Sequence, residues 1–80
     1  MDNENFYFEN TEGVHSKFWA ISIIKDKENK IDCWWLIRKW GKIGDSGRIM
    51  RERIYSNYEV LRKKDKLIEE KKAKGYSPVL

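Results

Sequence analysis

The stretch IDCWWLIRKWGKIGDSGRIMRERIY, from Ile31 to Tyr55, contains two segments with strand patterns, separated by a short segment with three glycines. The first, Ile31 to Trp40, is rich in β-branched and aromatic residues, which is typical of a strand. The second segment, Arg48 to Tyr55, has the alternation of a strand. One face would carry Arg48, Met50, Glu52 and Ile54, and the other Ile49, Arg51, Arg53 and Tyr55. Glycines permit positive φ, and Asp-Ser suits a tight turn. The stretch therefore predicts two long strands joined by a tight turn.

Two more strands are predicted upstream. Lys17 to Lys25 (KFWAISIIK) is again β-branched and aromatic, and Asn5 to Asn10 (NFYFEN) is short enough for an edge strand. Thr11 to Ser16 (TEGVHS) and Asp26 to Lys30 (DKENK) are polar and predict turns. Apolar residues fall on both faces of the long strands, so the sheet is expected either to be covered on both sides or to dock a partner.

A helix is predicted after the last long strand. Ser56 and Glu59 in SNYE have the spacing of a capping box, and Gly75 supplies a C-terminal stop. Between them, from Asn57 to about Lys74, the apolar residues form one stripe along a highly charged helix. That stripe contains Val60, Leu61, Leu67 and Ile68.

Together these segments predict a single α+β domain over residues 1–80, an antiparallel β-sheet packed against one long C-terminal amphipathic helix. Residues 1–5 are expected to form an acidic tail and residues 77–80 a short C-terminal tail. Eighty residues, of which 40% are apolar, allow only a thin core. Trp19, Trp34 and Trp35 lie in mid-strand and are predicted to belong to that core.

The charge is distributed unevenly. The chain carries 17 Lys and Arg against 13 Asp and Glu, a net charge of +4. Residues 1–13 hold four of the acids and no Lys or Arg, so the remainder has 17 bases against 9 acids, or +8. An excess of this kind suggests an anionic partner.

Several classes of function find no support. A single cysteine, Cys33, excludes an internal disulfide and is expected to be buried and inert. His15 is the only histidine and is expected to be exposed in a turn, so a metal centre or a Cys–His pair is not indicated. No phosphate-binding glycine motif opens a helix. We therefore expect no catalysis, cofactor or metal. The absence of a signal pattern and of a long apolar run predicts a cytoplasmic protein that does not enter membranes.

Cations gather around the glycine-rich turn, with only two acids among them. Lysine and arginine neutralise phosphates without reading sequence, and the face of a tryptophan can stack on an exposed base or sugar. Trp40, which ends its strand just before the turn, is either a core residue or such a stacking surface. The candidate nucleic-acid-binding residues are Trp40, Lys42, Arg48, Arg51, Arg53, Arg38 and Lys39.

The motifs KFWAI, WGKIGDSG and KLIEEKKAKGY, in this order and spacing, resemble the WGR domain found in poly(ADP-ribose) polymerases and in many bacterial proteins. The resemblance runs from about Phe6 to Tyr76. This chain departs from the family pattern at five positions, of which Lys42 in place of the third-letter arginine matters most, because lysine keeps the charge but lacks the planar, bidentate guanidinium. The other departures are Asp45, Arg48, Glu52 and Lys64.

The resemblance implies a binding module without a catalytic domain. In the polymerases, WGR domains contact DNA at breaks, through the signature tryptophan and a nearby arginine. Carried over to this chain, these roles fall on Trp40 and Lys42. We therefore expect a nucleic-acid-binding module that recognises DNA ends or nicks. The alternative is a protein-interaction or homodimerisation module that uses an aromatic face of the sheet.

Overall fold

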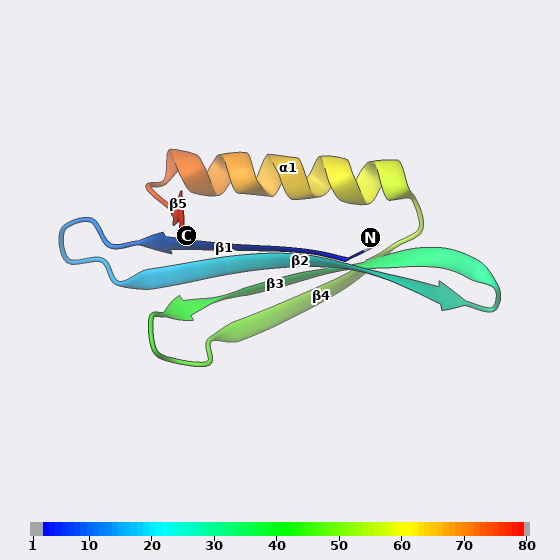
Figure 1. Cartoon of the computed structure of the whole chain (residues 1–80), viewed down its shortest axis with the longest axis horizontal. Coiled ribbons are helices and arrows are strands. Elements are labelled where there is room, and N and C mark those ends of the chain that lie inside the picture. Colours follow the sequence, from blue (N-terminus) through cyan, green and yellow to red (C-terminus); the bar gives the residue numbers. More distant parts are fainter. Residues whose placement is uncertain (1–2, 80) are drawn as a thin grey trace.

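The computed structural model describes residues 3–79 as an antiparallel five-stranded β-sheet with one helix against one of its faces (Figure 1). The order across the sheet is β4-β3-β2-β1-β5. The predicted α+β fold is confirmed. No helix within residues 3–79 is long and apolar enough to cross a membrane. The elements are β1 (Glu4–Asn10), β2 (Lys17–Glu28), β3 (Ile31–Lys42), β4 (Arg48–Ile54), α1 (Asn57–Ala73) and β5 (Ser77–Pro78).

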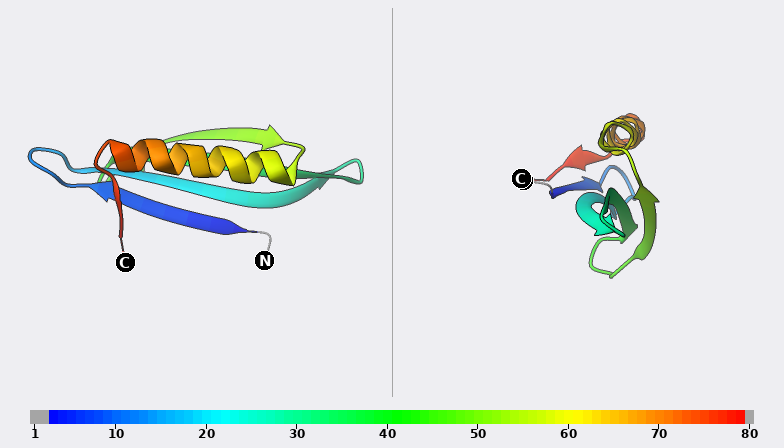
Figure 2. Two further views of the ribbon diagram at one scale, coloured as in Figure 1. Left: turned by 90° about the horizontal axis from the view of Figure 1, so that it is seen from above. Right: turned by 90° about the vertical axis from the view of Figure 1, so that its right-hand side faces the viewer.

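The core lies between α1 and one face of the sheet. On that face Ile21 of β2 is fully buried, and Leu36 of β3, also fully buried, pairs with Ile23. Burial of each aliphatic side chain of this size stabilises the fold by ~1.5–3 kcal/mol. Figure 2 shows that the sheet is strongly twisted and that α1 covers only one of its faces. The core consists of Phe8, Trp19, Ile21, Ile23, Leu36, Ile54 and Val60.

Helix α1 begins and ends within one residue of the predicted bounds. The Ser56 hydroxyl accepts a hydrogen bond from the Glu59 backbone N–H at 3.2 Å, as expected for an N-cap. At the other end Gly75 has φ +97°, and the backbone N–H of Tyr76 returns to the carbonyl oxygen of Lys71 at 3.1 Å. Of the predicted stripe, Val60 is buried, whereas Leu61, Leu67 and Ile68 are half-buried against the core.

The turn predicted at Asp26 to Lys30 is wrong in its extent. Strand β2 continues to Glu28, and the turn consists of Asn29 and Lys30 alone, with φ of 51° and 69°. Two consecutive residues with positive φ are typical of a tight hairpin turn whose twist matches that of its strands. The polar residues before the turn are therefore strand residues, and they interact across the hairpin.

Trp35 is not in the core, contrary to the prediction. It lies on the outer face, the sheet face that α1 does not cover, where its indole N–H donates to Asp26 at 3.0 Å. The guanidinium of Arg53 lies 4.3 Å from the Trp35 ring centroid. Alternation along β3 explains the difference, because adjacent tryptophans point to opposite faces. Trp34 packs against the core as predicted, and Trp19 is part of it.

Both ends of the chain differ from simple tails. Glu4 and Asn5, expected in an acidic tail, belong to β1, while Met1 and Asp2 lie outside the described residues. Residues 77–78, expected in a C-terminal tail, form β5 beside β1. The short β5 holds the chain that follows α1 against the sheet.

Candidate functional site

The glycine-rich turn between β3 and β4 packs directly on its own strand. A Cβ on Gly47 would lie 2.5 Å from the carbonyl oxygen of Trp40 and 2.7 Å from the ring of Phe18, and one on Gly41 would lie 2.9 Å from the Cα of Gly47. Only glycine fits such close approaches, and Gly47 also has φ +79°. The backbone N–H of Ile43 donates to the carbonyl oxygen of Ser16 at 3.0 Å. The turn is thus held to the loop before β2, and the backbone around Trp40 is fixed.

Trp40 lies on the sheet face that α1 covers. It pairs with Trp19 on β2 and with Arg48 on β4. Its side chain is half-buried and packs against the core. The rest of the side chain lines three hollows at this end of the sheet. The structure therefore confirms that Trp40 packs on the core, and because part of its side chain also lines the surface, its role as a stacking surface stays a prediction.

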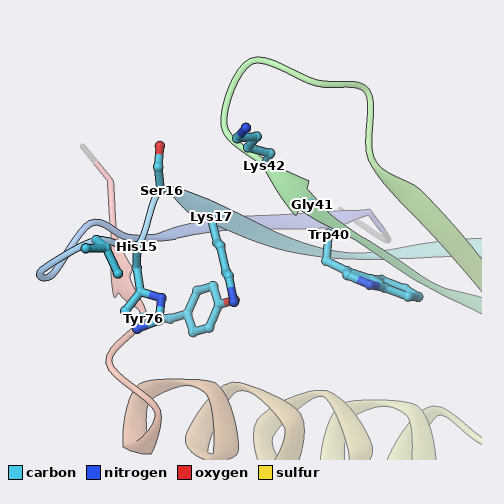
Figure 3. A pocket seen from close by; sticks show the side chains of 8 residues that line it. His15, Ser16, Lys17, Trp40, Gly41, Lys42 and Tyr76 are labelled. Carbon is cyan, nitrogen blue, oxygen red and sulfur yellow. The ribbon is translucent and has the colours of Figure 1, made fainter.

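The largest of these three hollows, which we call the Tyr76 pocket, measures about 500 Å³ and lies beside the end of α1 (Figure 3). In Figure 3 the Lys17 side chain extends toward Tyr76, on the same side as Trp40, whereas Lys42 extends away toward the β3–β4 turn. The pocket is lined by Val14, His15, Ser16, Lys17, Trp40, Gly41, Lys42 and Tyr76.

The second hollow, the turn pocket, measures about 430 Å³ and lies over the glycine-rich turn. It places Lys42 and Arg48, both exposed, beside Trp40. Asp45 is its one acidic lining residue. Lys42 and Arg48, two of the predicted site residues, therefore lie beside the tryptophan.

The third hollow, the Arg38–Lys71 pocket, measures about 240 Å³ and lies between the sheet and α1. Arg38 is two residues before Trp40 on the same face of β3, and its guanidinium lies 3.2 Å from the carboxylate of Glu52. The pocket is lined by Trp19, Arg38, Trp40, Met50, Leu67, Glu70, Lys71 and Lys74.

A buried asparagine positions the end of the helix at the site. Asn10 is 6% exposed, and its side-chain amide donates to the carbonyl oxygen of Lys74 at 3.2 Å. Its side-chain oxygen accepts from the backbone N–H of Glu12, also at 3.2 Å. Tyr76, two residues after Lys74, packs against the core. Asn10 thus joins the end of β1 to the end of α1 and sets the positions of Lys74 and Tyr76.

The structure separates the seven predicted site residues into two groups. Trp40, Arg38, Lys42 and Arg48 line the hollows described above. The other three point to the outer face, because they alternate with Trp40 or with Arg48 along their strands. These three are Lys39, Arg51 and Arg53.

Arg53 is also engaged by other protein groups. Its guanidinium lies 2.6 Å from the carboxylate of Glu28, which accepts a hydrogen bond from the Tyr55 hydroxyl at 2.6 Å. These two contacts, that from Tyr55 first, hold the pKa of Glu28 below its ordinary value. Five positions along β3 separate Trp35, which lies opposite Arg53, from Trp40. Arg53 therefore packs against the β2–β3 hairpin near its Asn29–Lys30 turn, which we call the distal hairpin.

Sequence reasoning did not single out the lysines and the tyrosine that approach Trp40 from other elements. Lys17 begins β2, Lys71 and Lys74 belong to the end of α1, and Tyr76 follows it. In the sequence, the segment KKAKGY indicates a helix end, because Gly75 supplies a stop and lysines suit the negative end of a helix dipole. The sequence does show a cluster of lysines there and an aromatic residue after the glycine stop. Local patterns do not show, however, that α1 ends beside Trp40.

The site is strongly cationic. Burial lowers the pKa of the Lys71 ammonium, and the nearby charges of Lys74, Arg38 and Lys17 lower it further, against an opposing effect of Glu70. The cations beside Trp40 and Tyr76 are suited to holding an anion next to aromatic rings.

Within residues 3–79, no group of three or more His, Cys, Asp and Glu side chains could hold a metal ion. Cys33 is buried as predicted, and that burial raises the pKa of its thiol.

The comparisons with known proteins agree with the motifs. The family model for the WGR domain matches residues 4–80, essentially the whole chain. No similar protein was found among the curated proteins, and no solved structure matches the chain. The WGR domain is a non-catalytic domain, and the family is consistent with a nucleic-acid-binding module. The chain belongs to the WGR domain family.

Proposed function

We propose that this domain binds nucleic acid, preferentially DNA ends or nicks, through Trp40 and the cations around it. The observation that carries the proposal is the position of Trp40, half-buried between the core and three hollows whose linings include Lys17, Lys42 and Arg48. Packing on the core holds the indole rigidly, and a rigid ring loses little entropy when a base or sugar stacks on it.

The preference for DNA ends or nicks follows from the stacking proposed for Trp40, which requires an exposed base or sugar face. A terminal or nicked nucleotide offers a free base or sugar face, whereas an intact duplex hides its bases between neighbours. The exposed cations Lys42 and Arg48 on either side of the turn can neutralise the adjoining phosphates. Lys42 gives charge without the bidentate geometry of arginine. We propose that Arg48, across from Trp40 in the ladder, supplies the planar guanidinium at this turn.

The test compares DNA forms at one salt concentration. Fluorescence anisotropy with a labelled nicked duplex, competed by blunt, single-stranded and closed circular DNA, should rank DNA with ends or nicks above the closed circle per binding site. Trp40→Ala should weaken binding to ends by ~1–3 kcal/mol with little change in salt dependence. Circular dichroism melts must show that the variant is folded, because Trp40 packs on the core. Absence of salt-sensitive binding to every form would contradict the proposal.

A second candidate is a protein-interaction or homodimerisation module. It is favoured by the outer face, where Tyr7, Ile24, Ile49 and Tyr55 are exposed and α1 lies on the other side. An apolar interface of this kind holds or strengthens as salt rises, whereas phosphate contacts weaken. Sedimentation of the protein without nucleic acid at low and high salt distinguishes the two candidates.

A further inference from the structure

We propose that the Arg38–Lys71 pocket binds a phosphate group. The inference goes beyond nucleic-acid binding, because this site can be occupied by free phosphate or by a phosphate of a strand that contacts Trp40. Only the second case rests on the proposed function. The hollow of about 240 Å³ is smaller than the ~300–1,000 Å³ of pockets for small organic ligands, which favours a compact anion.

The pocket combines rigid walls with a cationic rim. Trp19 and Trp40, neighbours in the β2–β3 ladder, and the half-buried Leu67 provide apolar walls. The three cations come from two separated parts of the chain, Arg38 from β3 and Lys71 and Lys74 from the end of α1. Apolar walls that exclude water strengthen the attraction between such cations and an anion.

The cations of the pocket are incompletely neutralised by the protein. Within residues 3–79, Lys71 and Lys74 form no salt bridge, and Glu70 is the one carboxylate that lines the pocket. Arg38 interacts with Glu52, but Glu52 also pairs with Lys63 of α1, so one carboxylate serves two cations.

Arg38 retains hydrogen-bonding capacity. Its Nη2 approaches Glu52 at 3.2 Å and the sulfur of Met50 at 3.1 Å, while its Nε is buried without a hydrogen-bond partner. A guanidinium has five N–H donors, and these contacts do not use all of them. Burying a donor without an acceptor is unfavourable, so a small side-chain movement that offers these groups an anion would be favoured.

Lys71 is the pocket cation that lies near two aromatic rings. Its ammonium lies 5.8 Å from the Trp19 ring centroid and 5.3 Å from that of Tyr76, so aromatic rings rather than carboxylates surround it. Burial and the charges of Lys74, Arg38 and Lys17 disfavour its ionised form, as its lowered pKa indicates. A phosphate among these cations would offset their mutual repulsion, which is a driving force for binding.

The test titrates the protein with inorganic phosphate, using sodium chloride at equal ionic strength as the reference. The Nε–Hε signal of Arg38 and the indole signals of Trp19 and Trp40 are followed by ¹H–¹⁵N NMR. Phosphate should produce saturable shifts at these signals that chloride does not. Lys71→Gln should weaken the binding about tenfold or more, since a charged hydrogen-bonding partner is lost. Lys71→Arg, which keeps the charge, should retain most of it.

Lys66→Gln is the matched control, because Lys66 also lies on α1 but lines a different hollow, with Glu59 and Arg62. It should leave the phosphate titration unchanged. Lys71→Gln leaves the Arg38–Glu52 pair intact and should remain folded. A non-saturable response, or equal affinities for Lys71→Gln and the parent protein, would overturn the inference.

The source of the phosphate is distinguished by a competition. If the pocket takes a phosphate of the nucleic acid, free phosphate should weaken binding to nicked DNA in the parent protein more than in Lys71→Gln, at constant ionic strength. If phosphate titrates the pocket but does not affect DNA binding, the site serves free phosphate. If DNA does not bind at all while phosphate still does, the proposed function fails and the pocket assignment stands.

Discussion

Gly47 lies against the backbone of Trp40, so closely that a Cβ at this position would be 2.5 Å from the Trp40 carbonyl oxygen. This contact links the turn chemistry of the WGKIGDSG segment to the candidate site. The glycine is needed where the turn folds back on the strand, and the strand residue that it touches is the one that lines all three hollows.

Gly47→Ala should therefore destabilise the domain. The substitution combines a clash with backbone and with the Phe18 ring and a positive φ of 79°, and a cost of ~1–3 kcal/mol is expected for strain of this kind. Gly44→Ala is the control, since Gly44 also has positive φ, 98°, but a Cβ there meets nothing within 4 Å. Thermal unfolding should show a larger loss for Gly47→Ala, and equal losses would contradict the close packing.

Asn10→Ala should destabilise the domain and disturb the site. The variant leaves the Lys74 carbonyl oxygen and the Glu12 N–H without their side-chain partner, at a cost of ~1–3 kcal/mol. Asn5→Ala, an exposed change on the same strand, should have little effect. NMR shifts at Tyr76 would report displacement of the end of α1, and an unchanged Tyr76 in a destabilised variant would show that Asn10 does not position it.

Lys71 should titrate below the ordinary lysine pKa. Its folded-state pKa is lowered, so the folded state binds this proton more weakly than the unfolded chain does. The resulting cost to stability is fully present below the folded pKa and disappears as pH rises through the window between the folded pKa and the ordinary lysine value. NMR titration of the lysine Cε groups, with and without phosphate, measures the shift. Phosphate should raise the Lys71 pKa, and a Lys71 that titrates at the ordinary lysine value without phosphate would contradict its burial among other cations.

Arg53→Gln should destabilise the distal hairpin and leave nucleic-acid binding unchanged. The variant removes the ion pair with Glu28 and the cation above Trp35. The lowered pKa of Glu28 contributes stability above the unfolded carboxyl pKa, and this contribution is lost as pH falls through the folded pKa. The difference in melting temperature between the parent and Arg53→Gln should therefore shrink in acid. A loss of DNA affinity in a fully folded variant would show that Arg53 does contribute to nucleic-acid binding.

Much of the fold could be predicted because local patterns specify it. The alternation in β4, the cap at Ser56 and the glycine stop at Gly75 each depend on residues a few positions apart. The turn predicted at DKENK was too long because polar composition does not distinguish a loop from an exposed strand. The outer-face contacts of Asp26 and Glu28 decide the matter, and they involve partners across the hairpin.

The site was predictable only in part. Strand alternation places Arg48 and Arg51 on opposite faces, and that separation was available from the sequence, although both entered one cation cluster. Lys17, Lys71 and Tyr76 approach Trp40 through tertiary packing of β2 and the end of α1. The spacing of residues within one helix or strand does not show which residues α1 places at the end of β3. This half of the site could therefore not be predicted from the sequence.

The most direct test of the account is the salt dependence of binding to nicked DNA for Arg48→Gln and Arg51→Gln, compared with the parent protein. Both arginines are exposed, lie three residues apart on β4 and lose the same charge, but only Arg48 faces the side of Trp40. The account predicts that Arg48→Gln weakens binding and reduces the log–log salt slope by about 1, whereas Arg51→Gln changes neither. Equal effects of the two substitutions, or no effect of Arg48→Gln, would contradict it.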